Sequence, residues 1–417
     1  MDERRRMEAG GGRMIARIQG GRLRGAVRAV TSKSCAHRLL IAAALADAPT
    51  DIVIDAANQD IEATARCLQA LGAGVAQSGA SWRVTPVRPV ESAALDCGES
   101  GATLRFLMPV AAALGTAALF TGQGRLPERP HAPLCEALRA HGAHIDSDRL
   151  PMRVRGVPMS GEYRLPGDVS SQYVSGLMLA LPLLDGDSRI RFTTPMASQS
   201  YIGLTVDALA AFGVQVRKEE NGYAVPGGQR YHSPGRARVE GDWSAAAFWL
   251  AANATGSAVT VDGLNDRSAQ GDRAVLRVMD RLRTGSAVID ASDIPDLVPA
   301  IAAAAASLPG QTRVVNAGRL RYKECDRLAA LAQGLSAMGA RVRETEDGLD
   351  ITGGPLHGAR VAGFNDHRVV MALAIAALSA KGETVIDDAQ AVSKSYPGFW
   401  ADFIALGGHA HVEQSGQ

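Results

Sequence analysis

The chain has 417 residues, of which 46% are apolar and 21% are charged, and its formal net charge is +1. This length exceeds what one hydrophobic core usually organises, so we expect two domains. The near-neutral charge gives no electrostatic reason to expect a nucleic-acid or membrane-surface partner, so any positive site must be local.

Three features bear on the compartment of the chain. Five cysteines are scattered without any CxxC spacing, which argues against a disulfide framework or a structural zinc site and suits a reducing cytoplasm. Residues 1–12 contain three consecutive arginines with no apolar stretch after them, so we predict a disordered tail and not a signal peptide. Apolar runs such as residues 300–308 are too short to span a bilayer.

A glycine recurs where successive predicted helices end and a β-prone pair follows, with a spacing of roughly 70 residues. The clear copies are Gly72, Gly142, Gly213 and Gly339, and weaker ones are Gly285 and Gly407. Glycine closes a helix in the left-handed conformation. Units this small cannot bury their own faces, so we predict two globular domains of three units each. Unrelated helix caps in an α/β protein are the alternative.

The first predicted helix start carries cations. Residues 32–38 precede an apolar run at 39–45, and Ser32 or Ser34 is a natural N-cap that would place the positive helix end beside Lys33 and Arg38. This combination predicts an anion site. Lysine is rare here, and the three lysines that stand inside polar clusters are Lys33, Lys323 and Lys394. A compact ammonium is therefore favoured at those positions.

Other helix starts repeat this theme. Residues 98–105 open a helix with small residues, and the loop at 124–130 holds Arg125 and Arg129, either of which could clamp a phosphate or carboxylate. Residues 170–172 precede another apolar helix, and residues 323–327 place a lysine and an arginine at i and i+4. Ordinary caps and surface salt bridges are the alternative for each. Together they predict an anion-filled cleft between the domains.

These motifs resemble, in order, those of the 3-phosphoshikimate 1-carboxyvinyltransferase (EPSP synthase) family. The matching stretches are 32–34, 98–105, 125–130, 170–172, 322–327 and 366–368, together with Lys394. The resemblance implies an α/β fold: a two-domain inside-out α/β barrel in which each domain has three βαβαββ units. It also implies a discontinuous domain of residues 13–33 and 240–417, with residues 34–239 inserted as the other.

The resemblance further implies an activity: transfer of the enolpyruvyl group of phosphoenolpyruvate to the 5-hydroxyl of 3-phosphoshikimate, with no metal and no organic cofactor. We expect a cytoplasmic monomer. Phosphoshikimate-binding residues by this resemblance are Lys33, Ser34, Arg38, Ser170, Ser171, Gln172, Ser198, Asp296 and Lys323. Phosphoenolpyruvate-binding residues are Lys33, Gly101, Arg125, Gln172, Arg327, Arg368 and Lys394.

The catalytic residues implied by the resemblance are Lys33, Asp296 as proton acceptor and Glu324 as proton donor. A donor carboxyl must be protonated, so burial should raise the pKa of Glu324 while Lys323 and Arg327 lower it. The sequence leaves open which influence is larger.

There are two alternative functions. Enolpyruvyl transfer to a UDP-sugar is disfavoured because the matching loop, residues 124–129, has no cysteine and because Ser34 follows Lys33. A non-catalytic scaffold is supported only by departures from the family pattern at Glu99 and Arg319. A phosphate-release assay with both substrates, and a UDP-sugar control, separates these alternatives.

Departures from the common family pattern at Glu99, Ala102 and Phe106 border the expected phosphoenolpyruvate pocket. Because Ala102 and Phe106 alter helix packing behind Gly101, we predict reduced sensitivity to glyphosate, the competitor of phosphoenolpyruvate in this family. The inhibition constant for glyphosate measures this. A value as low as that of ordinary sensitive members would refute the prediction.

Overall fold

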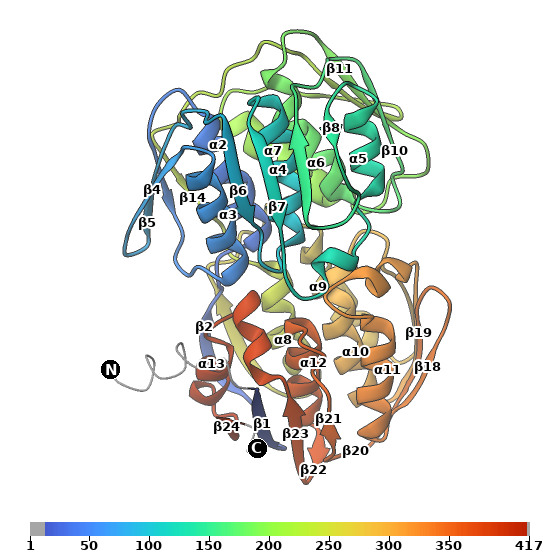
Figure 1. Ribbon diagram of the computed structural model, residues 1–417. Helices are drawn as coiled ribbons and strands as arrows, with labels where there is room; N and C mark the ends of the chain where they lie inside the picture. The colour runs from blue at the N-terminus through green and yellow to red at the C-terminus, as the bar shows by residue number, and fades with distance from the viewer. Residues whose placement is uncertain (1–12, 415–417) are drawn as a thin grey trace.

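The computed structural model describes residues 13–414 and contains two separate hydrophobic cores. One core is built from residues 36–239, and the other from residues 16–27 and 243–406. In Figure 1 they form two lobes, which we call the upper and lower lobe from their places in that view. The chain therefore enters the lower lobe, builds the upper one, and returns.

The upper lobe contains three four-stranded sheets with one shared plan. In each, two neighbouring strands run parallel and an antiparallel hairpin continues the sheet. In sheet order the strands are β14 (Arg236–Arg238), β3 (Thr50–Val53), β5 (Ser81–Thr85) and β4 (Gly74–Ser78); β6 (Ser92–Asp96), β7 (Ala117–Thr121), β9 (Met152–Arg155) and β8 (His144–Ile145); β10 (Glu162–Leu165), β11 (Ser188–Phe192), β13 (Gly222–Val225) and β12 (Arg217–Glu219).

Helices fill the interior of the upper lobe, and the sheets surround them (Figure 1). The helices are α2 (Lys33–Leu45), α3 (Gln59–Ala70), α4 (Gly101–Ala113), α5 (Ala132–Arg139), α6 (Ser171–Ala180) and α7 (Gln199–Ala211), with 3-10 turns η1 (Leu126–Glu128) and η2 (Leu181–Leu183). α4 and α6 are apolar on nearly every face because they lie in the centre. Sequence analysis predicted this inside-out arrangement, and the fold confirms it.

The lower lobe repeats the plan with the N-terminal strands built in. Its sheets are β16 (Ala287–Asp290), β17 (Gly310–Val315), β19 (Leu349–Gly353) and β18 (Arg341–Glu344); β21 (Arg360–Val361), β23 (Glu383–Asp387), β1 (Met14–Gln19) and β24 (Ala410–Gln414); β15 (Ala258–Asp262) with β2 (Arg24–Arg28); β20 (Leu356–His357) with β22 (Ala380–Lys381). Its helices are α8 (Trp243–Ala254), α9 (Val275–Arg283), α10 (Val298–Ser307), α11 (Arg327–Ala337), α12 (His367–Ala377) and α13 (Phe399–Ala405), with η3 (Gly271–Ala274), η4 (Pro295–Leu297), η5 (Gly318–Tyr322) and η6 (Ala389–Lys394).

The chain passes between the lobes twice, and the two crossing segments pair at Thr31 and Gly241. Asp242, in the returning segment, caps two helices at once. Its Oδ1 accepts from the backbone N–H of Ala245 at 2.8 Å in α8, and its Oδ2 accepts from that of Lys33 at 3.2 Å in α2. Ser32 holds the predicted N-cap position, but its hydroxyl makes no capping bond. A carboxylate from the other crossing segment satisfies α2 instead.

The recurrent glycines behave as predicted. All six, at positions 72, 142, 213, 285, 339 and 407, have positive φ and lie two or three residues after the last residue of a helix. The conformation costs little only for glycine. The predicted tail of residues 1–12 lies outside the described residues, and the residue limits of the domains stay a prediction.

Close packing of α4 against α6 depends on one glycine. A Cβ at Gly176 would collide with the carbonyl oxygen of Arg105. We therefore expect Gly176→Ala to lower the free energy of unfolding by about 1–3 kcal/mol. Chemical denaturation measures the change.

Gly203 in α7 is the matched control, because a Cβ there would meet only the Ala269 methyl at 3.9 Å. Gly203→Ala should raise the free energy of unfolding by about 0.5–1 kcal/mol through reduced chain entropy. Equal effects at the two positions would contradict the packing argument.

Candidate active site

A cavity of about 690 Å³ is lined by residues of both lobes. Its upper wall comes from the first turns of α2, α4, α6 and α7, where backbone N–H groups attract anions, and from the loop at 128–133. Its lower wall comes from η4, η5 and the starts of α11 and α12. The predicted site residues that line it are Lys33, Ser34, Arg38, Gly101, Ser170, Ser171, Gln172, Ser198, Asp296, Lys323, Glu324, Arg327 and Arg368.

Arg327 organises the lower wall. Its guanidinium is 1% exposed and contacts three carboxylates: Nε donates to Asp366 Oδ2 at 2.8 Å, Nη2 to Glu324 Oε2 at 2.8 Å, and Nη1 to Asp296 Oδ1 at 3.3 Å. Asp366 also caps α12, accepting from the backbone N–H of Arg368 at 2.8 Å. The start of α12 and the start of α11 are therefore fixed relative to each other.

Asp296 is the most strongly paired acid of the cavity. Arg368 Nη2 lies 3.1 Å from its Oδ2, and Lys323 Nζ lies 3.6 Å from its Oδ1. Burial raises the pKa of the Asp296 carboxyl, but Arg368, Lys323 and Arg327 together outweigh burial and bring the pKa well below its usual range. Burial in turn lowers the pKa of Lys323 to about 8, although Asp296 opposes this.

The structure shows whether burial or the neighbouring cations have the larger influence on the pKa of Glu324. Burial raises the pKa of its carboxyl, but Arg327, Arg129, His367 and Lys33 act against burial and hold the pKa well below its usual range. The cations therefore have the larger influence, and this carboxyl is ionised in the cavity without a bound anionic ligand.

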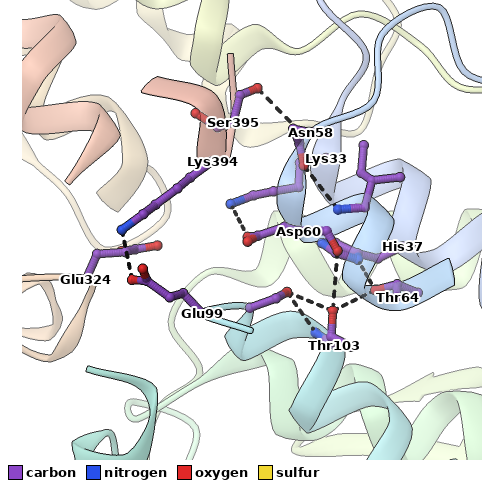
Figure 2. A network of polar contacts seen from close by, with 12 residues as sticks. Lys33, His37, Asn58, Asp60, Thr64, Glu99, Thr103, Glu324, Lys394 and Ser395 are labelled. Carbon is purple, nitrogen blue, oxygen red and sulfur yellow. Dashed lines mark hydrogen bonds and ion pairs between the residues drawn. The ribbon is translucent and has the colours of Figure 1, made fainter. Parts of the chain in front are cut away.

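Lys33 lies at the start of α2, and its Nζ donates to Asp60 Oδ2 at 2.9 Å (Figure 2). Burial lowers the pKa of Lys33, yet Asp60 and Glu324 raise it by more, so the ammonium stays charged. Asp60 was not predicted from the sequence. Its only signal was a carboxylate in the first turn of α3, which ordinary helix formation also explains.

The upper wall presents buried guanidinium groups that form no ion pair with a carboxylate in the described part of the chain. Arg105 donates to Gln172 Oε1 at 2.7 Å, and Arg129 lies against Gly101. Within residues 13–414, Nε of Arg105 and Nε of Arg129 are buried without a hydrogen-bond partner. Arg38 is satisfied, with Nε donating to Thr205 Oγ1 at 2.7 Å. Unpartnered buried donors beside a glycine mark the place where an anion fits.

The structure does not bring two predicted residues to the cavity wall. Arg125 is 40% exposed, and its Nε lies 3.3 Å from Glu128 Oε2. Lys394 is buried but donates to Glu99 Oε2 at 2.8 Å (Figure 2). It also donates to the Asn365 carbonyl at 2.7 Å. The Glu99–Lys394 pair joins the start of α4 in the upper lobe to η6 in the lower lobe.

Arg319, a departure from the family pattern, does line the cavity. Its Nη1 donates to Ser198 Oγ at 3.0 Å. Ser198 is buried in the left-handed conformation with φ 57°, which is unusual for a non-glycine residue, and its N–H donates to the Ser292 carbonyl at 3.0 Å. Arg319 therefore adds a cation beside a strained helix start.

Two further observations concern the described residues 13–414. No group of three or more His, Cys, Asp or Glu side chains gathers there as a metal site would require. None of the helices in that range has the length and apolar character needed to span a bilayer.

Two inside-out α/β lobes thus place cations of both lobes around one cavity. The EPSP synthase (3-phosphoshikimate 1-carboxyvinyltransferase) family model matches residues 18–403. The chain is 40% identical to the 3-phosphoshikimate 1-carboxyvinyltransferase of Clostridium kluyveri, covering 93% of this chain and 96% of that protein. It is 40% identical to the enzyme of that name from Halobacterium salinarum, covering 94% and 99%.

The solved structure of EPSP synthase from Acinetobacter baumannii has a TM-score of 0.80 and 25% identity, over 96% of this chain and 100% of that one. The chain belongs to the EPSP synthase family. The resemblance drawn from the sequence motifs is confirmed, and the chain is a transferase by that family.

Proposed function

We propose that the chain transfers the enolpyruvyl group of phosphoenolpyruvate to the 5-hydroxyl of 3-phosphoshikimate, the shikimate-pathway step toward aromatic amino acids. We further propose that it acts in the cytoplasm as a monomer. The observation that carries the proposal is the cavity itself, where Arg105 and Arg129 are buried and the Nε of each has no hydrogen-bond partner within residues 13–414. The two substrates bring phosphate and carboxylate groups that such donors require.

The proposed phosphoshikimate site uses residues of the upper wall together with Asp296 and Lys323 of the lower wall. It comprises Lys33, Ser34, Arg38, Ser170, Ser171, Gln172, Ser198, Asp296 and Lys323, all of which line the cavity. Hydroxyl and amide groups at three helix starts suit a polyhydroxylated phosphate ester.

The proposed phosphoenolpyruvate site uses Lys33, Gly101, Gln172, Arg327 and Arg368. We propose Arg129 in place of Arg125, because Arg129 lies in the wall against Gly101, while Arg125 does not line the cavity and pairs with Glu128. Lys394 reaches this ligand only after leaving Glu99, so Glu99 competes with the substrate for that ammonium.

The proposed domain limits are residues 13–33 with 240–417, and residues 34–239. Two separate cores support them, as does the pairing of the crossing segments at Thr31 and Gly241.

The proposed reaction has two steps. In the addition, the 5-hydroxyl oxygen bonds to C2 of phosphoenolpyruvate, Asp296 takes the hydroxyl proton, and Glu324 gives a proton to C3. In the elimination, Glu324 recovers the C3 proton, the bond from C2 to the phosphate oxygen breaks, and phosphate leaves with one proton. Fixed cations stabilise the negative charge throughout without reorganising.

Glu324 must be protonated to act as the donor, although the cations lower its pKa. Bound phosphoenolpyruvate supplies this condition, because its charges are placed against Arg327, Arg129 and Lys33. Neutralising these cations removes the influence that lowered the pKa and leaves burial, which raises it. Substrate binding and protonation of Glu324 are therefore coupled.

We expect Glu324→Gln to lower kcat by at least about 10²-fold while the KM values of both substrates stay close to wild type, because a proton transfer is lost and no anion contact is removed. Phosphate release with both substrates measures this. Glu346→Gln, on an exposed residue of the same lobe, is the matched control and should leave kcat unchanged. A fully active Glu324→Gln enzyme would remove Glu324 from the chemistry.

Two arginines of one loop separate the two possible phosphoenolpyruvate contacts. Arg129→Met should raise the KM for phosphoenolpyruvate by about 10- to 100-fold, the usual value of a charged hydrogen bond. Arg125→Met should change it by less than about 2-fold, because that side chain makes only an exposed ion pair. The reverse pattern would return the assignment to Arg125.

A further inference from the structure

A second buried carboxylate lies behind Asp296 and is not part of the reaction described above. Asp272, in η3, is 2% exposed. Its Oδ2 accepts from the Tyr201 hydroxyl at 3.0 Å and from the Ser244 hydroxyl. Its Oδ1 is buried without a hydrogen-bond partner in the described part of the chain. No Lys or Arg there forms an ion pair with it, unlike Asp296.

The Tyr201 hydroxyl lies between two carboxyl groups. It is 3.0 Å from Asp272 Oδ2 and 3.2 Å from Asp296 Oδ2. One hydroxyl has one proton and can donate to only one of them. The second contact becomes a hydrogen bond only when one carboxyl is itself protonated and donates to the phenol oxygen. The three groups are thus arranged to share one additional proton.

The surroundings decide which carboxyl holds that proton. Asp296 faces Arg368, Lys323 and Arg327, which favour its ionised form. Asp272 faces Tyr201 from α7, Ser244 and Asp242 from the start of α8, Asp296 from η4 and Arg368 from α12. In α9, which follows η3 directly, no charged side chain pairs with it. Burial and the charge of Asp296 raise the pKa of Asp272 to about 7, against the lowering by Ser244 and Arg368.

We propose that Asp272, acting through the Tyr201 hydroxyl, holds the proton that Asp296 takes from the substrate hydroxyl between the two steps of the reaction. The inference rests on the proposed function. Asp272 does not line the cavity and acts through Tyr201, so it is a positioning residue.

Asp296, Tyr201 and Asp272 together account for every proton in the two steps. In the addition, Asp296 takes the hydroxyl proton and passes it to the Tyr201 oxygen as Tyr201 gives its own proton to ionised Asp272. In the elimination, the same transfers run backwards, and Asp296 delivers the proton to the departing phosphate. The substrate hydroxyl proton leaves on phosphate, and the three side chains return to their initial state.

Keeping the substrate hydroxyl proton on Asp296 itself would cost free energy, because three cations oppose protonation of this carboxyl. Asp272 removes that cost by keeping the proton one hydroxyl away. Below a pH of about 7, Asp272 is already protonated and cannot accept. The relay therefore predicts that kcat falls as the pH drops through about 7.

The first test is Asp272→Asn, which keeps the size of the side chain and removes its titration. At about pH 8 we expect kcat to fall by about 10²-fold, with the KM values of both substrates within about 2-fold of wild type. The decline of kcat near pH 7 should also disappear. Asp272→Glu should restore part of kcat and the decline. A wild-type kcat and pH profile in Asp272→Asn would overturn the proposal.

Tyr201→Phe provides a second test that does not depend on the folding of an Asp272 variant. It removes the connecting hydroxyl and leaves both acids. We expect its kcat loss to match that of Asp272→Asn, and the double variant to lose no more than either single variant, since both break one relay. If the kcat losses of the two single variants instead multiplied in the double variant, the proposal would be overturned.

Infrared spectroscopy observes the stored proton directly, without turnover. The C=O stretch of a protonated carboxyl should appear as the pH falls through about 7 in wild type, and at a lower pH in Asp296→Asn, because the Asp296 charge that raises the pKa of Asp272 is then gone. It should be missing in Asp272→Asn. Its persistence in Asp272→Asn would overturn the assignment. Phosphate release by wild type with both substrates tests the proposed function separately, so an active enzyme with an unaltered Asp272→Asn profile refutes only the relay.

Discussion

The cleft depends on the buried guanidinium of Arg327, which binds three carboxylates at once. Burial lowers the pKa of this group, but Asp366, Glu324 and Asp296 outweigh burial and keep it charged. Its planar fork can orient several acids where a lysine would act as a point charge. By holding Asp366 at the cap of α12, it also ties a structural helix start to the two acids with proposed catalytic roles.

The arrangement of the lobes explains why so many cations can gather at one place. Equivalent helix starts from repeated units converge, and each supplies N–H groups that attract anions. Asp242 joins the crossing segments by capping α2 and α8 together, so the first turn of α2 in the upper lobe is anchored to a residue beside the lower one. The position of Lys33 is therefore set by both lobes.

Much of the architecture followed from the sequence, because a glycine that closes a helix leaves a local signal that the structure bears out at positions such as 72 and 339. The site was harder to predict. Arg125 and Arg129 belong to one loop, and only the fold decides which side chain turns inward. The pKa of Glu324 depends not only on nearby Arg327 but also on Arg129, His367 and Lys33 from distant segments. Asp272 had no local signal at all, since its contacts with Tyr201 and Ser244 join separate helices.

The Glu99–Lys394 contact has a consequence for selectivity. An ammonium that already has a carboxylate neighbour gains little from a weak, singly charged solute, because the exchange replaces one ion pair by a poorer one. A dianion that engages several other donors at the same moment can complete the exchange. We therefore expect small inorganic ions to bind Lys394 poorly. The Lys394–Glu99 ion pair between the lobes should persist until a multivalent anion binds.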